Sequence, residues 1–472
     1  MGSFEPHRSV GSLLMWSAVA LVLLGAGGQA IPTNDLHIFL AMGQTMAETG
    51  QLLEQETFTW TAPGAEFLHG PWGFSWLSWH VYDAVGLIGL RWINGLAAAS
   101  TVWIVGRTAR LRGADPRAAA FGCFFAAGLM IQNLTVRSQT WVFPLFAGLL
   151  WCLAKPRRLR LSLPFVVITG CLWTNLHGSF PAGLVAIGAL GAGAVLQSKS
   201  FKAITPFALA GLCFGLGTLM GPYGADIYGY VLSNSSAPEA RGLSEWGAPS
   251  LTTFSGARLA FALVVWALLL VRSPREMDWS DGLLSLAFAG LALTGTRFIA
   301  WFGIAAAVPF AMQVHRLMAP SQGLPPRLYR GIASAVGLYW AVVLGSALGP
   351  KTSELDPDTP IAGIAAIQES APGGRLFNPP EWGGYATMTL GEAWKTSGDI
   401  RVWVFDDPSW RTYPVLVQAP DGWEEALDER SVSHLLLRKE HFHALLIEPA
   451  RRSHKWTLLH EDEHSAAFQR VP

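Results

Sequence analysis

Charged residues are scarce in this 472-residue chain. They make up 14% of it, against roughly a quarter in an ordinary soluble domain. The shortage is uneven, because about one residue in ten is charged up to Pro350 and about one in four from Lys351 onward. Long apolar runs fill the first stretch, and together with the missing charge they exclude a single soluble domain. The last stretch has ordinary soluble composition.

Cysteine is also rare, and basic residues are not in excess. The four cysteines, Cys123, Cys152, Cys171 and Cys213, lie inside apolar runs without CxxC spacing. This pattern excludes a disulfide framework and a zinc site, and we interpret the four as inert thiols buried in lipid. The formal net charge is zero and no basic face dominates, so we expect no nucleic-acid partner.

Eleven apolar runs are long enough, or nearly so, to cross a lipid bilayer. They are residues 11–31, 84–106, 117–133, 139–154, 162–175, 179–197, 203–220, 257–272, 281–296, 298–314 and 331–349. The first run has an alternative interpretation as a cleaved signal peptide, because small residues precede Ile31, but its length favours a retained helix. The sequence therefore predicts an α-helical polytopic membrane protein with about 11 transmembrane helices.

The basic residues predict how these helices are oriented. Sixteen Lys and Arg residues fall in the loops on one side and only five on the other, and the segment 32–83 has none. By the positive-inside rule the N-terminus is then cytoplasmic and the C-terminus extracytoplasmic. We predict a transmembrane domain over residues 1–350, with an outer first loop over 32–83, and a small soluble α/β domain over 351–472.

Shorter patterns predict local structure in the outer segments. The apolar stripe between Asp35 and Leu53 is typical of a helix lying along the membrane surface. In the tail, a helical pattern covers Pro360 to Ser370. Strand-like runs follow at Arg401–Phe405, His434–Arg438 and Ala466–Arg470. Without cysteine, the tail must be stabilised by packing, and we expect its core to contain Trp382, Tyr385, Phe405, Trp423 and Trp456.

Polar residues near the outer helix ends form the candidate site. The predicted topology brings nine of them to one membrane face: Asp35, His37, His69, Arg137, Asn175, His177, Tyr223, Glu245 and Arg297. Ionisable groups at membrane depth are costly and often mark substrate paths. Each also has an ordinary explanation: Asp35 as a helix cap, Arg137 as a snorkelling side chain, Glu245 as a solvated group. Their gathering on one face favours a site.

Short motifs occur in a fixed order along the chain. They are Asn34-Asp-Leu-His37, Arg137-Ser-Gln139, Trp173-Thr-Asn-Leu-His-Gly-Ser-Phe180, Gly221-Pro-Tyr-Gly224, Glu245-Trp246, Arg297, Glu381-Trp-Gly-Gly-Tyr385 and Val404-Phe-Asp-Asp407. These ordered landmarks resemble the GT-C superfamily of polytopic glycosyltransferases. More closely, they resemble a group of bacterial members with an extracytoplasmic C-terminal α/β domain.

The resemblance implies a function and roles for the candidate residues. Asp35 matches the catalytic carboxylate of that superfamily, and the donor is a sugar on a polyprenyl phosphate. Arg137 and Arg297 are suited to stabilising the departing phosphate, while His177 or His37 would donate hydrogen bonds to it. The remaining candidate residues would bind substrate. The resemblance also implies a bacterial inner membrane, a periplasmic C-terminal domain, and an outer glycan, lipid or protein as acceptor.

Departures from the pattern keep an alternative open. Pro71 stands where the related proteins have a glutamate, which favours a non-catalytic assembly or scaffold protein that binds a partner through its periplasmic domain. A transporter is disfavoured, because charged residues gather at one face without paired broken helices at the midplane. No cofactor is predicted; a divalent metal ion is possible but nothing in the sequence supports it.

Overall fold

The computed structural model describes residues 6–32, 35–155, 159–240, 244–272, 277–318 and 354–471. The predicted run at 331–349 lies outside these residues. Internal contacts divide the chain into two compact units. The first unit comprises Met1–Gln29, Ile88–Leu232 and Pro238–Lys351; the second comprises Ala30–Leu87, Ser233–Ala237 and Thr352–Pro472. Residues of the predicted first loop thus belong to the same unit as the C-terminal residues.

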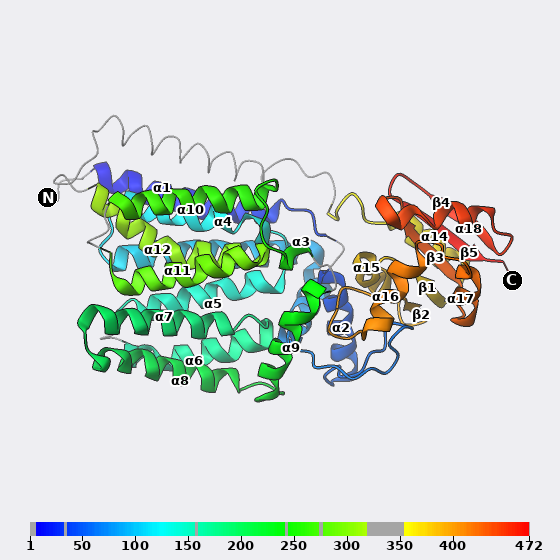
Figure 1. Ribbon diagram of the computed structural model, residues 1–472, viewed down its shortest axis with the longest axis horizontal. Helices are drawn as coiled ribbons and strands as arrows, with labels where there is room; N and C mark the ends of the chain where they lie inside the picture. The colour runs from blue at the N-terminus through cyan, green and yellow to red at the C-terminus, as the bar shows by residue number, and fades with distance from the viewer. Residues whose placement is uncertain are drawn as a thin grey trace. The chain divides into compact units, whose positions relative to one another are not determined.

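Helices make up the first unit and lie side by side as a bundle (Figure 1). Close packing joins α4 to α1 and α12, α6 to α8, and α11 to α7 and α12. Its helices are α1 (Pro6–Gly27), α3 (Trp72–Leu111, from Ile88 onward), α4 (Pro116–Leu129), α5 (Ser138–Leu153), α6 (Leu159–Leu176), α7 (Pro181–Ser198), α8 (Thr205–Thr218), α9 (Asp226–Ala240, in large part), α10 (Phe254–Arg272), α11 (Trp279–Thr294) and α12 (Ile299–Leu317).

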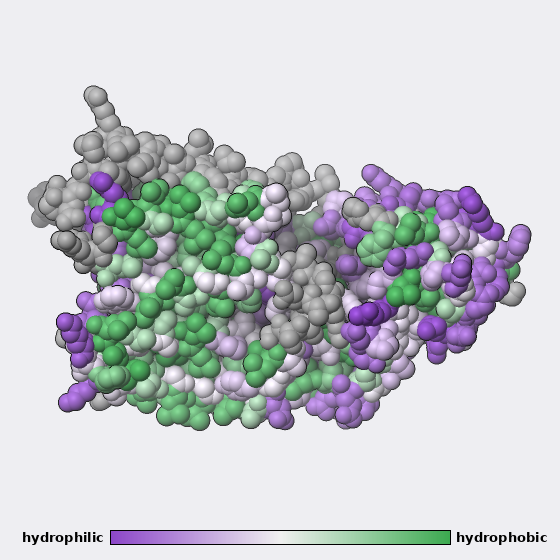
Figure 2. Space-filling view, in the orientation of Figure 1, coloured by the Kyte–Doolittle hydropathy of each residue, from purple (hydrophilic) through white to green (hydrophobic). Residues whose placement is uncertain are grey.

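The surface of the bundle is apolar in the way that lipid requires. In Figure 2 hydrophobic residues cover much of its visible face, and large side chains such as Leu161 and Leu268 are 85% and 61% exposed. Such exposure suits a bilayer better than water. Among the described residues, five helical stretches are long and apolar enough to cross a membrane: Trp72–Leu111, Pro181–Ser198, Phe201–Thr218, Phe254–Arg272 and Thr296–Leu317. The predicted count of eleven spans is not confirmed.

Helix α3 is much longer than a bilayer crossing needs. Its 40 residues would span about 60 Å if straight, against a hydrocarbon core of about 30 Å. A kink interrupts it at Gly86, whose φ of 68° and ψ of −166° are not helical. Glycine alone adopts such dihedrals easily. The kink marks the point where the chain passes from the second unit to the first.

A mixed five-stranded sheet organises the second unit, in the order β2-β1-β3-β5-β4. Strand β1 pairs in parallel with β2 and β3, whereas β5 is antiparallel to β3 and β4. The strands are β1 (Gly374–Phe377), β2 (Trp394–Thr396), β3 (His434–Arg438), β4 (Trp456–Glu461) and β5 (Ser465–Arg470). The accompanying helices are α2 (Asp35–Thr49), α14 (Ile361–Ser370), α15 (Pro380–Leu390), α16 (Asp407–Leu416), α17 (Trp423–Glu429) and α18 (Ile447–Arg452).

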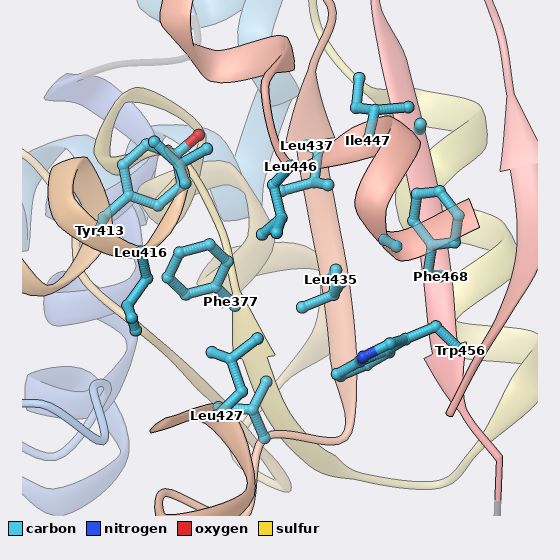
Figure 3. Close-up of a cluster of buried hydrophobic side chains, with 14 of the residues drawn as sticks. Phe377, Tyr413, Leu416, Leu427, Leu435, Leu437, Leu446, Ile447, Trp456 and Phe468 are labelled. Atoms are coloured by element: carbon cyan, nitrogen blue, oxygen red, sulfur yellow. The ribbon is translucent and has the colours of Figure 1, made fainter. Parts of the chain in front are cut away.

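Alternation along β3 separates the core of the sheet into two layers. Leu435 and Leu437 face a cluster with Phe377, Tyr413 and Phe468 (Figure 3). Leu436 faces the opposite layer, where α14 and α15 pack. This is the two-residue period of a strand buried on both faces. The predicted helix at Pro360–Ser370 and strands at 434–438 and 466–470 are confirmed within one residue at their ends.

The predicted aromatic core of the tail is also found. Trp382, Phe405 and Trp456 are buried, and Tyr385 and Trp423 pack against the two core layers from partly buried positions. Gly383 permits a close backbone contact, because a Cβ atom there would lie 2.0 Å from the carbonyl oxygen of Gly398.

The predicted strand at Arg401–Phe405 is wrong. These residues form turns, with backbone hydrogen bonds from Val402 to Ile400 and from Val404 to Arg401. The run alternates like a strand, yet the Arg401 side chain is fully buried and is held by Asp399, two residues earlier. This local ion pair pulls the backbone into a turn.

Part of the predicted first loop adds to the edge of the sheet. Thr59 forms a parallel bridge with Thr396 of β2, and the Trp60 indole donates a hydrogen bond to the carbonyl of Leu376 at 3.0 Å. Ahead of this bridge, the predicted helix after Asp35 is confirmed as α2, which ends before Gly50 and packs on α15.

Candidate functional site

Two arginines share one carboxylate at one end of the helical unit. Nη1 of Arg137 lies 2.8 Å from Oε2 of Glu245, and Nη1 of Arg297 lies 3.7 Å from Oε1 of the same group. Arg137 immediately precedes α5, Glu245 lies in the short 3₁₀ helix η4 (Ser244–Trp246), and Arg297 lies in η5 (Thr296–Phe298) before α12. We call these three residues the arginine–glutamate cluster.

Neighbouring groups hold the cluster in place. The Arg297 guanidinium lies over the Trp246 ring, 4.0 Å from its centre, a distance typical of a cation–π contact. Gln139 donates a hydrogen bond to the backbone carbonyl of Arg297 at 3.1 Å, and Thr296 donates one to the carbonyl of Glu245 at 3.0 Å. The landmarks Arg137-Ser-Gln139, Glu245-Trp246 and Arg297 therefore meet in space.

The charges of the arginine–glutamate cluster favour the binding of an anion. Two guanidinium groups and one carboxylate carry a net charge of +1, and the three side chains are 25%, 18% and 37% exposed. Burial raises the pKa of Glu245, but Arg137 and Arg297 outweigh burial and hold this pKa below its usual range. Glu245 is thus ionised at neutral pH and orients both guanidinium groups without cancelling their charge.

His177 lies in the turn between α6 and α7, near the same end. Its Nδ1 atom is 2.8 Å from the hydroxyl oxygen of Ser179, whose backbone N–H also donates to Nδ1 at 3.0 Å. Burial and the charges of Arg297 and Arg137 lower the pKa of His177 to about 3. The imidazole is therefore neutral at physiological pH and within electrostatic reach of the cluster. Ser179 lies within the motif Trp173–Phe180, but nothing in the sequence indicates its contact with His177.

Two further predicted residues occupy the helix ends nearby. Asn175, in the last turn of α6, donates hydrogen bonds to the carbonyls of Cys171 at 2.7 Å and Met220 at 3.4 Å. It thereby joins α6 to the turn that follows α8, the same turn that contains Tyr223. These contacts connect helix ends, so Asn175 contributes to the shape of this end of the bundle.

The other three predicted site residues belong to the second unit. Asp35 is the first residue of α2, and its carboxylate stands in the first turn of that helix. His37, on the same helix, is buried and meets the Tyr385 ring edge-on, 5.2 Å between ring centres. His69 is fully buried, and its Nε2 lies 3.0 Å from the hydroxyl of Ser75. His69 is thus enclosed by protein.

Sequence reasoning missed a buried ion network in the second unit. Nη2 of Arg401 lies 2.6 Å from Asp399 and 2.7 Å from Glu56, with all three side chains inaccessible to solvent. Glu56 also accepts hydrogen bonds from the backbone amides of Phe58 and Thr59 at 2.7 and 2.8 Å. Burial lowers the pKa of Arg401, but the two carboxylates outweigh burial and raise it. The network ties the segment around Glu56 to the C-terminal residues.

His69 makes the stability of the second unit depend on pH. Burial, with the charge of Arg401, lowers the pKa of His69 from 6.5 to about 3. Between these values the unfolded chain binds a proton that the folded chain does not, so stability rises with pH. We expect His69→Gln, which retains a nitrogen that can reach Ser75, to reduce the slope of unfolding free energy against pH between 4 and 6 by up to about 1.4 kcal/mol per pH unit. Equal slopes, measured by denaturant unfolding of both proteins, would contradict this assignment.

Several solved structures are similar to this chain. Neither a family model nor a curated protein matches the sequence. Among solved structures, ArnT from Cupriavidus metallidurans is similar both bound to undecaprenyl phosphate, with a TM-score of 0.60, and in the apo state, with a TM-score of 0.61. Each match has 12% sequence identity and covers 97% of both chains.

A third similar structure is the arabinofuranosyltransferase AftD from Mycobacteria. The match has a TM-score of 0.52 and 14% identity, and it covers 98% of this chain but 41% of that one. At these identities the likeness concerns the fold. The resemblance inferred from the ordered sequence landmarks is therefore confirmed by structures that share the architecture along nearly the whole chain. This chain has the fold of the ArnT and AftD structures, and the part of it that the structure describes includes several helices long and apolar enough to cross a membrane.

Proposed function

We propose that this protein is an integral-membrane glycosyltransferase, which transfers a sugar from a polyprenyl-phosphate-type lipid donor to an extracytoplasmic acceptor. One observation carries the proposal: a cluster of two arginines and one glutamate, with a net charge of +1, lies at one end of an apolar helical bundle. A lipid phosphate needs an apolar surface for its tail and cationic donors for its head. The similar ArnT structure is bound to undecaprenyl phosphate, which is a ligand of this kind.

In the proposed reaction, the bonds that form and break balance, and each group has a defined role. The Asp35 carboxylate accepts the proton of an acceptor hydroxyl as its oxygen attacks the anomeric carbon of the sugar. The bond between that carbon and the phosphate oxygen breaks, and the polyprenyl phosphate leaves with the electron pair. Arg137 and Arg297 stabilise the negative charge that develops on the phosphate. Five other residues orient the substrates directly or hold the substrate-binding groups in place: His37, His69, Asn175, Tyr223 and Glu245.

The proposal includes a location and partners. The excess of Lys and Arg in the loops of one side supports a cytoplasmic N-terminus and a C-terminal domain on the opposite face of a bacterial inner membrane. The donor then reaches the site from the lipid bilayer, and a glycan, lipid or protein acceptor approaches from the periplasm.

Donor consumption by the purified protein tests this function. The protein in liposomes is supplied with a panel of labelled polyprenyl-phosphate sugars and an envelope extract as the source of acceptor. We expect transfer of label from one donor, and a loss of about 100-fold or more in Asp35→Asn. Asp226→Asn is the matched control, because Asp226 is also a carboxylate in the first turn of a helix.

Two results would contradict the proposal in different ways. Full activity of Asp35→Asn would show that Asp35 takes no part in the reaction, although the protein would still be a glycosyltransferase. Absence of transfer from every donor, together with co-purification of a stoichiometric partner, would favour the non-catalytic scaffold that Pro71 suggests.

A further inference from the structure

The turn that follows α6 surrounds one side of the His177 imidazole with hydrogen-bond donors. The backbone N–H of Ser179 donates to Nδ1 of His177 at 3.0 Å. A backbone N–H is always a donor, so the nitrogen that it meets carries no proton. A neutral imidazole has one proton on one of its two nitrogens. The proton of His177 is therefore on Nε2.

The hydrogen bonds of the Ser179 hydroxyl support the same assignment of the proton to Nε2. Its oxygen is 2.8 Å from Nδ1 and accepts a hydrogen bond from the indole N–H of Trp173 at 3.0 Å. An indole nitrogen can only donate, so it occupies an acceptor position of the serine oxygen and leaves the O–H to point at Nδ1. Both donors of Ser179 thus oppose a proton on that nitrogen.

Trp173 is fixed by its surroundings, so this arrangement is preorganised. Its side chain is fully buried and stacks on Trp301 with 5.5 Å between ring centres and 9° between ring planes. The edges of Phe146 and Phe214 enclose it at 5.7 and 5.9 Å. Trp301 lies one helical turn after Arg297. One aromatic stack therefore supports both the turn of His177 and the start of α12.

We infer that Ser179, positioned by Trp173, fixes His177 as the neutral tautomer with its proton on Nε2, so that His177 offers the bound phosphate a hydrogen bond and takes no part in proton transfer. Within the part of the chain that the structure describes, Nε2 forms no hydrogen bond, and its N–H is therefore the donor that a ligand meets. The ligand in this inference rests on the proposed function, whereas the tautomer does not.

The charged groups around His177 oppose its protonation. Arg297 and Arg137 both act on the ring, and burial adds to their effect, which lowers its pKa to about 3. The Glu245 carboxylate is paired with both arginines. A neutral donor next to two cations can bind a phosphate oxygen without adding a third charge that would repel them.

Nitrogen NMR tests the tautomer on the wild-type protein without any ligand. In protein labelled with ¹⁵N-histidine, two-bond proton–nitrogen correlations distinguish the two neutral tautomers and the imidazolium, and the signal missing from His177→Gln identifies His177. We expect the tautomer protonated on Nε2 from pH 5 to pH 8. A dominant Nδ1–H form or an imidazolium at pH 7 would overturn the inference, whatever the activity of the protein.

Two pairs of variants then test the role toward the phosphate. Glutamine can place an N–H near the position of Nε2 and asparagine cannot, so His177→Gln should bind undecaprenyl phosphate about 3 to 10 times more tightly than His177→Asn. Ser179→Ala removes the O–H donor but keeps the backbone N–H that meets Nδ1, so it should weaken binding several-fold without moving the proton to Nδ1, and Ser179→Thr should restore binding. Equal affinities within each pair, in variants whose unfolding matches the wild type, would show that His177 does not donate to the phosphate. Binding by none of the proteins, with the expected tautomer present, would refute the proposed function and not the tautomer.

Discussion

Replacing Arg137 by alanine should lower sugar transfer by a factor of about 100 to 1,000, because the loss of one preorganised donor to a developing anion typically has an effect of this size. Arg137 supplies one of the two positive charges of the arginine–glutamate cluster. Its removal reduces the net charge of the cluster from +1 to zero, so binding of undecaprenyl phosphate should weaken as well. Transfer rates and lipid affinity in liposomes measure the two effects.

Glu245→Gln is the matched control for this prediction. Both variants delete the same ion pair, in which the two groups are 2.8 Å apart, but the glutamine variant raises the net charge of the cluster to +2. If the cluster binds phosphate, the affinity for undecaprenyl phosphate falls in Arg137→Ala and does not fall in Glu245→Gln. If the pair only holds helix ends together, the two variants lose affinity to the same extent, and the proposed role of Arg137 is wrong.

Replacing Arg401 by methionine should destabilise the second unit by about 3 to 5 kcal/mol, the range typical of a buried ion pair broken on one side. The change leaves the carboxylates of Glu56 and Asp399 without the guanidinium that lies within 2.7 Å of both. Two buried carboxylates then lack the cation that offsets the cost of their burial. Hydrogen–deuterium exchange across residues 54–67 should increase first, because Glu56 holds the amides of this segment.

An exposed pair provides the comparison. Arg411 pairs with Asp407 at 3.1 Å, with both side chains more than half exposed. Arg411→Met should therefore change stability by less than about 0.5 kcal/mol. Adding Glu56→Gln and Asp399→Asn to Arg401→Met should recover much of the lost stability. Similar effects of Arg401→Met and Arg411→Met on exchange and on the denaturant midpoint would contradict the network's structural role.

The sequence predicted that the members of the arginine–glutamate cluster lie on one membrane face, together with six other polar residues, but it did not predict their pairing. Arg137, Glu245 and Arg297 follow or precede apolar runs, and alternation of loops across a membrane assigns them to one face. No local signal relates Glu56 to Arg401, since their contact depends on how the first loop bridges to β2. The run at Arg401–Phe405 likewise has the pattern of a strand, although these residues form turns in which the buried Arg401 pairs with both Asp399 and Glu56.

The hydrogen bonds of His177 likewise could not be predicted from the sequence. The motif that contains Trp173, His177 and Ser179 was recognised, yet the spacing of these residues does not show which nitrogen of the imidazole faces the serine. Trp173, which donates to the Ser179 hydroxyl, stacks on Trp301, and this contact joins helices far apart in the sequence. Composition and topology could therefore assign these polar residues to one face of the membrane, and packing was needed to assign the protonation of His177.

A density map of the protein in lipid nanodiscs, prepared with undecaprenyl phosphate, tests the central claim most directly. We predict an elongated lipid along the helical bundle, with its phosphate within hydrogen-bonding distance of Arg137 and Arg297 and of Nε2 of His177. In Arg137→Ala nanodiscs prepared in the same way, the phosphate density should be lost. A phosphate bound away from both arginines, or a lipid that occupies the bundle equally in the variant, would contradict the proposed function.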